Sequence, residues 1–485
     1  MKFECEKQGA DDGLNRRSLL KSAAAGFGGL ALSGLFADEV AAMNLSDAAK
    51  ASLNPLAEKL PHFAPRAKRV IFLFMHGGPS QMDTFDYKPQ LQKDDNKPMP
   101  FAGPRVTFAG KNKLGKLLGS PFKFKQYGQC GKWVSSLFPH VGSVVDDLCF
   151  VHSLHGSNPA HGGALMKIHT GSDVFVRPSM GSWISYGLGT ENENLPSFIT
   201  ICPTLGHGGV GNYSSSFLPA AHHGTAIGHA GVKARNSTIN HLTQKRYKSK
   251  EQKKLLELLR QMNQSQLKNA VKDQALEGRI ASFELAFKMQ MAAPDVLDFK
   301  QESAAVKQLY GIDEKHTENF GTQCLMARRL SEKGVRFVQC THSYKWDQHG
   351  SLRKKHTSNA LEVDKPIAGL IKDLKSRGQL DDTLVIWGGE FGRTSISQGG
   401  RDGRDHNPHG FTWFLAGGGT KPGLSYGATD EYGYYAKENK VHIHDMHATI
   451  LHLLGLNHEK LTYRQLGRDF RLTDVAGHVV KDIMI

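Results

Sequence analysis

Short apolar runs rich in β-branched residues recur along most of this sequence and alternate with longer amphipathic segments. A strand that is covered on both faces shows no polar alternation, because neither of its faces meets water. The pattern is therefore typical of a mainly parallel sheet packed between two layers of helices. We predict a three-layer α/β/α sandwich with buried strands at residues 70–75, 148–152, 197–201, 336–340, 383–387 and 412–416.

The segments between these runs carry apolar residues at helical spacing and supply the two outer layers. One long, basic segment interrupts the alternation, and we expect it to form a helical insertion around residues 240–295 beside the sheet. The predicted helices lie at residues 163–170, 251–291, 322–333, 357–376 and 445–454.

The first 42 residues look like an export signal. Arg16-Arg17 stands just before an apolar, small-residue run at 22–37, and Ala41-Ala42 offers a cleavage site. This order is typical of a twin-arginine signal peptide. The alternative is a buried or membrane helix, but the run is too short and too rich in glycine for a stable span.

The organisation that follows is a signal peptide at 1–42, a linker at 43–68 and one large domain at 69–485. We expect the twin-arginine export machinery to deliver the chain to the periplasm, the cell surface or the medium, with no stable membrane span.

Composition narrows the function classes. The six cysteines include no CxxC pair, which excludes the common thiolate zinc modules and a disulfide scaffold. The formal net charge is +15, yet the basic stretches have no interleaved aromatic residues, so no nucleic-acid groove is predicted. The 24 histidines occur in tight groups, which makes imidazole and carboxylate ligands the candidates for a metal site.

Most polar clusters come directly after a predicted strand. His76 follows the first strand, His161 comes soon after the second, and Asp347-Gln-His349 follows the strand at 336–340. Glu390 follows the strand at 383–387. Because loops at the carboxyl ends of parallel strands converge on one crevice, we expect these side chains and His406 to share a site.

Five motifs in order strengthen this picture: HGGPSQMDTFD at 76–86, WDQH at 346–349, EFGRT at 390–394, GRDHN at 403–407 and AGGG at 416–419. Together they resemble the DUF1501 family of exported, sulfatase-like proteins, over a match from about residue 69 to the C-terminus. That family is grouped with the alkaline phosphatase-like superfamily. The resemblance implies an alkaline phosphatase-like fold and a metal-centred crevice.

The resemblance also implies roles for single residues. His161 stands where sulfatases place a nucleophilic Cys or Ser, and Glu390 keeps a ligand carboxylate where the neighbouring Phe391 cannot ligate. His406 lies before a strand that ends in a Gly-rich turn, as a ligand histidine does in alkaline phosphatases, and His409 is the second choice.

Each of these residues has a simpler alternative role. Asp347 and His349 are predicted ligands, or else a helix cap and a surface histidine. Glu390 is a ligand or the buried partner of Arg393. His76, where the superfamily has a metal-binding Asp, is a ligand or a turn cap.

His161 carries three open roles, as nucleophile, as general base and as metal ligand. Arg177, Arg393 and Arg404 are candidate clamps for a sulfate or phosphate group, because a guanidinium binds such anions through two parallel hydrogen bonds. Ordinary salt bridges are the alternative for each arginine.

The working hypothesis is a metal-dependent hydrolase of sulfate or phosphate esters. Asp347, His349, Glu390 and His406 would hold one or two divalent ions, with zinc preferred and manganese or calcium as alternatives. The alternative function is a non-catalytic envelope protein of the same fold that binds an anionic glycan, and the missing Cys or Ser at position 161 favours it.

Overall fold

The computed structural model describes residues 55–102, 115–239 and 296–485, apart from positions 193 and 399, together with a few separate positions between 254 and 289. The predicted signal peptide and, except for those few positions, the predicted helical insertion lie outside the described residues. Within the described part of the chain, no helix has the length and apolar character needed to cross a membrane.

The described strands of the central sheet are β1 (Arg69–Met75), β4 (Leu148–His155), β5 (Phe198–Ile201), β6 (Thr225–Ile227), β7 (Phe337–His342), β8 (Thr383–Gly388), β11 (Phe411–Ala416), β12 (Ser425–Tyr426) and β15 (Val441–His442). Their order is β12-β4-β11-β8-β1-β7-β5-β6, and β15 pairs with β4 beside this path. β11 runs antiparallel to β4 and β8. The other pairings in this sheet are parallel.

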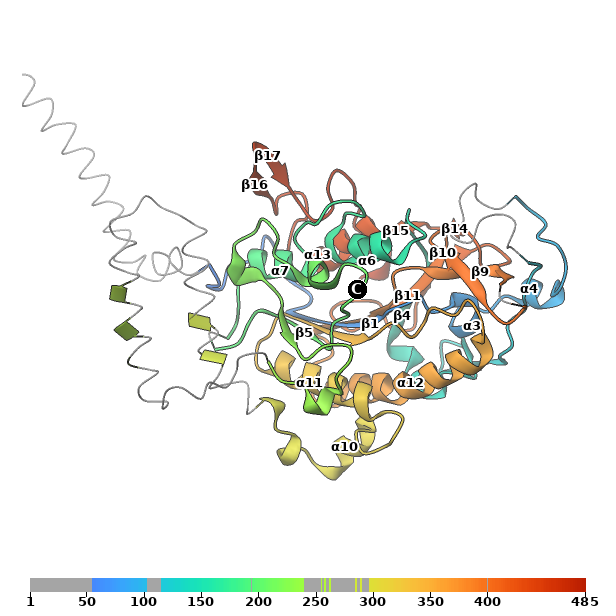
Figure 1. The fold of residues 1–485 in the computed structure, drawn as a ribbon, viewed down its shortest axis with the longest axis horizontal. Coiled ribbons are helices and arrows are strands. Elements are labelled where there is room, and N and C mark those ends of the chain that lie inside the picture. Colours follow the sequence, from blue (N-terminus) through green and yellow to red (C-terminus); the bar gives the residue numbers. More distant parts are fainter. Residues whose placement is uncertain are drawn as a thin grey trace, which may run out of the picture. The chain divides into compact units, whose positions relative to one another are not determined.

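Helices cover both faces of the sheet (Figure 1). On one face lie α6 (His161–Thr170), α7 (Met180–Leu188) and α13 (Ile443–Leu453), and on the other α10 (Ala304–Tyr310), α11 (Glu318–Glu332) and α12 (Leu352–Ser376). Alternate residues of β1 enter the two cores, because successive side chains of a strand point to opposite faces. Phe72 packs in the core of α6, α7 and α13, and Leu73 packs in the core of α11 and α12. The predicted three-layer α/β/α sandwich with a mainly parallel sheet is confirmed.

Shorter elements complete the described fold: α3 (Gln81–Thr84), α4 (Pro89–Lys93), α5 (Pro139–Gly142), β2 (Phe124–Tyr127), β3 (Lys132–Ser135), β9 (Gly392–Ser397), β10 (Arg404–Asn407), β13 (Ala428–Thr429), β14 (Ala436–Glu438), β16 (Tyr463–Gln465) and β17 (Arg468–Phe470). β9 and β10 form a two-stranded antiparallel sheet in which His406 pairs with Arg393.

The topology brings the predicted polar clusters to one edge of the sheet. β1, β5, β7 and β8 are parallel neighbours, so their carboxyl ends lie on the same side. His76 comes directly after β1, and α6 begins at His161 after β4. The loops after β7 and β8 carry Asp347 and Glu390 to the same edge.

Candidate metal centre

Asp347 lies at the middle of a compact group of imidazoles. Its Oδ1 atom is 2.9 Å from His349 Nε2 and 3.1 Å from His406 Nε2. The two Nε2 atoms are 3.0 Å from each other. These three donor atoms form a nearly equilateral triangle, and we call Asp347, His349 and His406 the carboxylate site.

The other ring nitrogens of the carboxylate site decide what its donor atoms can do. His406 Nδ1 is 2.6 Å from the carbonyl oxygen of Pro159, and His349 Nδ1 is 2.5 Å from the amide oxygen of Gln398. An amide or carbonyl oxygen accepts but does not donate, so each Nδ1 carries the hydrogen. In the neutral rings both Nε2 lone pairs then face Asp347, as metal-binding histidines do.

His161 lies beside the other carboxylate oxygen of Asp347, Oδ2. Its Nε2 lies 3.3 Å from Asp347 Oδ2, and its Nδ1 lies 2.6 Å from Glu390 Oε1. Glu390 is buried and accepts the backbone N–H of Gly77 at 3.0 and 3.1 Å. The carboxylate therefore fixes the tautomer of His161 and points Nε2 into the centre.

Gly77 is required by this arrangement. Its φ angle is +117°, and a Cβ atom at this position would lie 2.6 Å from the backbone nitrogen of Asp347. The chain after β1 therefore passes against the Asp347 loop at a distance that only glycine permits.

A second group of imidazoles lies beside His161. His76 Nε2 is 3.2 Å from His207 Nδ1, and one donor atom each from His76, His161 and His207 lie within 4.8 Å of one another. We call these three residues the histidine site. His207 belongs to the loop after β5, and we did not predict it from the sequence, although its position after a strand is the same signal that identified His76.

Two residues of this region have strained backbones. His207 has φ of +48° and Tyr344 has φ of +45°, both in the left-handed region that non-glycine residues seldom adopt. The Tyr344 ring lies 4.9 Å from the His76 ring and 4.9 Å from the His207 ring. Its hydroxyl donates to Asp347 Oδ2 at 3.3 Å. Strain held at a cluster of this kind is typical of functional sites.

The charges of the carboxylate site suit a cation. Burial would raise the pKa of Asp347, but the neighbouring imidazoles of His161, His349 and His406 and the charge of Arg393 hold it well below its usual range. Burial lowers the pKa of His406 to about 4, against the opposing effect of Asp347. The site thus presents a charged carboxylate and a neutral imidazole at neutral pH.

The side chains of the centre are buried to different degrees. The His406 side chain is 1% exposed, whereas that of His349 is 33% exposed and that of Asp347 is 16% exposed. A ligand in solution can therefore reach the carboxylate site past His349.

Two of the three arginines predicted to clamp an anion, Arg393 and Arg404, are not available for that role. Arg393 is fully buried and donates to the carbonyl oxygens of Gly77, Gly78 and Trp346 and, at 2.7 Å, to Asp347 Oδ1. Arg404 is also fully buried and binds Asp83 through two hydrogen bonds of 2.7 and 3.1 Å. Both guanidinium groups are already committed to partners inside the protein, because a buried charge is costly unless it is paired.

The other predicted residues outside the two sites are Arg177 and His409. Arg177 pairs with Asp474 at 3.0 Å. His409 packs against Tyr435 with ring centroids 5.6 Å apart, and it belongs to none of the groups of metal-ligand spacing among the described residues. Asp405, which we did not predict, does belong to one, with His349 and His406. It lies inside the GRDHN motif, directly before His406.

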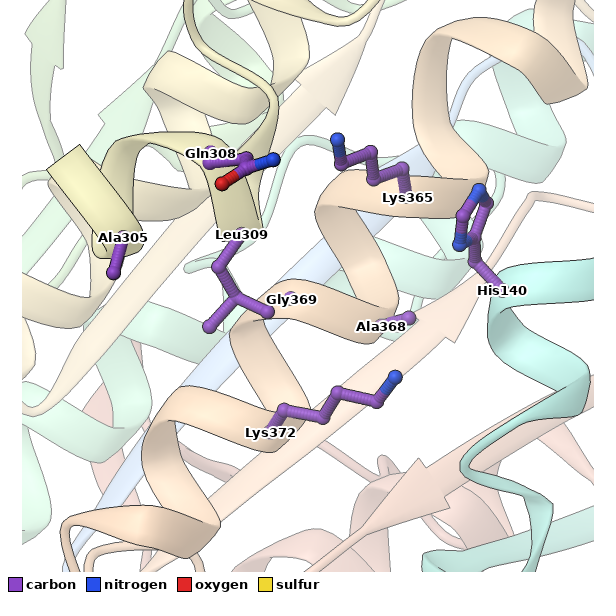
Figure 2. Close-up of a pocket in the computed structure, with 8 residues that line it drawn as sticks. All are labelled: His140, Ala305, Gln308, Leu309, Lys365, Ala368, Gly369 and Lys372. Carbon is purple, nitrogen blue, oxygen red and sulfur yellow. The ribbon is translucent and has the colours of Figure 1, made fainter.

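A cavity of about 310 Å³ lies on the α12 side of the sheet. Figure 2 shows Lys365 and Lys372 extending from α12, with Leu309 of α10 on one side of them and His140 of α5 on the other. None of the residues that line this cavity belongs to the carboxylate site or the histidine site.

Comparisons with solved structures return low similarity. Ps i-CgsB in complex with k-i-k-neocarrahexaose matches at 10% identity and a TM-score of 0.37, over 80% of this chain and 72% of that chain. PsFucS1 sulfatase from Pseudoalteromonas sp. matches at 13% identity and a TM-score of 0.35, over 81% and 69%. The alkaline phosphatase from the Antarctic bacterium TAB5 matches at 10% identity and a TM-score of 0.33, over 81% and 100%.

A search of the curated proteins finds no match. The family comparison gives a clear answer, because the model described as "Protein of unknown function (DUF1501)" matches residues 67–484, which is most of the chain. This chain therefore belongs to the DUF1501 family.

Proposed function

We propose that this protein is a metal-dependent hydrolase of sulfate or phosphate esters, with a divalent cation in the carboxylate site. The observation that carries the proposal is the triangle of Asp347 Oδ1, His349 Nε2 and His406 Nε2, with sides of 2.9, 3.0 and 3.1 Å. Two imidazole lone pairs and a carboxylate oxygen at such separations repel one another unless a cation or a proton lies between them.

The donor set favours zinc. Two imidazoles and one carboxylate are typical ligands of zinc, which leaves a fourth position for water or substrate in catalytic sites. Manganese accepts the same donors with lower affinity. Calcium prefers an all-oxygen shell of higher coordination number, which the two imidazoles of this site do not supply.

The chain's own residues position the reaction. When bound, the cation supplies Lewis-acid polarisation of the ester oxygen. Arg393 holds Asp347 in place through a buried ion pair of 2.7 Å and keeps its carboxylate charged. His161 has its Nδ1 hydrogen fixed on Glu390, so the three roles predicted for His161 all use Nε2.

The anionic group of the substrate needs contacts other than the predicted clamps. Arg393 and Arg404 are buried and paired, so neither can bind a sulfate or phosphate from solution. His349 and Tyr344 are the partly exposed polar side chains beside Asp347. We propose that they, with the cation, contact the ester.

One observation favours the alternative function, an envelope protein that binds an anionic glycan without hydrolysing it. Position 161 carries an imidazole that is held between two carboxylates, and not a hydroxyl or a thiol. In either function we propose that residues 1–42 direct export through the twin-arginine machinery.

The test uses the full chain, purified and stripped with a chelator. We expect hydrolysis of 4-nitrophenyl sulfate or 4-nitrophenyl phosphate to require added zinc or manganese and to be lost in Asp347→Asn, which keeps the size of the side chain but removes its charge. The matched control is His316→Gln, because His316 is an exposed histidine that belongs to none of the groups of metal-ligand spacing among the described residues. Metal binding by the parent without hydrolysis of either ester would support the glycan-binding alternative.

A further inference from the structure

We infer that the histidine site, together with Asp347 Oδ2, is a second divalent-cation site, and that Asp347 bridges two ions. This inference rests on the proposed function, because it adds a cation to the same centre. It assigns a role to His207 and His76, which the carboxylate site does not use.

The separations of the donor atoms fit a shared cation. Two nitrogens bound to one tetrahedral zinc at about 2.0–2.1 Å lie about 3.3 Å apart. His76 Nε2 and His207 Nδ1 are 3.2 Å apart, and His161 Nε2 and Asp347 Oδ2 are 3.3 Å apart. The three imidazole donors all lie within 4.8 Å of one another, so small rotations of the side chains bring them onto one ion.

The two carboxylate oxygens of Asp347 face different imidazoles. Oδ1 faces His349 and His406, whereas Oδ2 faces His161. A carboxylate whose oxygens meet different sets of imidazoles can bridge two ions. His161, Asp347 and His406 also form one group of metal-ligand spacing, so the two ions would lie close together.

The hydrogen bonds of the histidine site leave its imidazoles open to a cation. His161 is fixed by Glu390 with Nε2 directed at Asp347. His76 is buried, the partner of its Nε2 is another imidazole, and its Nδ1 has no hydrogen-bond partner among the described residues. A buried histidine that served only for packing would be expected to bond a carbonyl or carboxylate oxygen, as His447 bonds the carbonyl oxygen of Ile168.

The loop that supplies His207 is held in an unusual conformation. His207 has φ of +48°, and its ring stacks on that of His161 with centroids 4.9 Å apart and planes 22° apart. A left-handed conformation at a residue other than glycine persists only where surrounding contacts enforce it. Here it directs an imidazole toward His76.

The carboxylates of the centre offset part of the charge of two dications. Asp347 and Glu390 lie within the centre, and Asp405 is 3.7 Å from His349 Nδ1. Among the described residues of the centre, one buried guanidinium, that of Arg393, opposes these three carboxylates. With a second ion, His161 is a ligand, and the nucleophile or base role falls away because a nitrogen bound to a cation cannot take a proton.

The experiment measures ions per chain on the full, chelator-stripped protein after titration with zinc, by elemental analysis and isothermal titration calorimetry. We expect two equivalents in the parent and in the control His316→Gln, and one equivalent in His207→Gln and in His349→Gln. His207 is a half-buried residue of a largely exposed loop, and thermal unfolding of the metal-free variants checks that each is folded.

A spectroscopic measurement tests the bridge independently of activity. Two manganese ions joined by Asp347 should show exchange coupling in the electron paramagnetic resonance spectrum, and His207→Gln should replace it with the signal of an isolated ion. A parent that binds one ion, with the ion retained in His207→Gln and lost in His349→Gln, would overturn the second site while leaving the proposed function intact. Two bound ions without ester hydrolysis would instead contradict the proposed function and keep the second site.

Discussion

The two halves of the centre share Asp347 but are built differently. In the carboxylate site each imidazole has its second nitrogen bound to a fixed oxygen, and the donor atoms are 2.9 to 3.1 Å apart. In the histidine site, among the partners that the described residues provide, only that of His161 is a fixed oxygen, and His207 comes from a strained loop. A preformed set of ligands loses less conformational entropy on binding. The carboxylate site should therefore bind its cation more tightly than the histidine site.

The largest expected effect comes from the residue that both halves share. Asp347→Asn should lower zinc affinity at both sites by more than about 100-fold, since removing even an outer partner of a ligand costs about 10–100-fold. Thermal unfolding should also lose its dependence on zinc, because a bound ion stabilises only the folded state. Titration calorimetry checks the prediction, and retention of one tight equivalent would show that one half does not need Asp347.

Acidification should separate imidazoles that bind cations from imidazoles that only pack. Burial lowers the pKa of His222, His356 and His447 to about 3. Their unfolded pKa is 6.5, so their stabilising effect is complete above pH 6.5 and is lost as pH falls toward 3. Each should cost on the order of 1 kcal/mol of unfolding free energy between pH 7 and pH 5.5.

Denaturant unfolding of the metal-free protein at several pH values measures this loss. A free energy of unfolding that is flat from pH 7 to pH 5.5 would show that these histidines are not buried in neutral form. In the zinc-loaded protein the curve should also reflect proton competition at the ligands, which the metal-free curve lacks.

The two buried arginines should behave differently. Arg404→Met leaves Asp83 as an unpaired buried charge and should lower the free energy of unfolding by about 3–5 kcal/mol. Zinc affinity of the folded fraction should stay unchanged, because Arg404 contacts neither site among its described partners. Arg393→Met should lower both stability and zinc affinity, since Arg393 positions Asp347. Equal zinc affinity in the two variants would argue against a positioning role for Arg393.

The smallest expected effect is that of Glu390→Gln, which should change zinc binding at the histidine site but not at the carboxylate site. Glu390→Gln keeps an acceptor for His161 but removes the charge, and it should weaken zinc binding at the histidine site by about tenfold. The carboxylate site should change little, because its imidazoles bond Pro159 and Gln398. A two-site calorimetric fit checks this, and equal weakening at both sites would remove the distinction.

The sequence was informative about the fold for a physical reason. Continuous apolar runs identify buried strands, so β1, β4, β7 and β8 were found within a few residues of their ends. The direction of a strand leaves no trace in such a run, so the strand at 412–416 was predicted but the antiparallel direction of β11 was not. α7 was missed because its Ser and Gly residues weaken the helical pattern, although Ser179 caps its first turn.

The site was only partly accessible from sequence. The position of a residue after a strand identified His76, His161, Asp347, His349 and Glu390, and the family resemblance added His406. The structure brings these residues together. The roles of Arg393 and Arg404 were not accessible, because sequence does not show that a guanidinium is already paired with a buried carboxylate. His207 was missed for a similar reason, since its role depends on a loop conformation that no local pattern specifies.

The most direct test of the central claim is anomalous diffraction from crystals of the zinc-loaded full chain, recorded on both sides of the zinc absorption edge. The account predicts an anomalous peak within bonding distance, about 2.0–2.2 Å, of Asp347 Oδ1, His349 Nε2 and His406 Nε2. A protein that contains zinc by elemental analysis but shows no anomalous peak at Asp347 would contradict it.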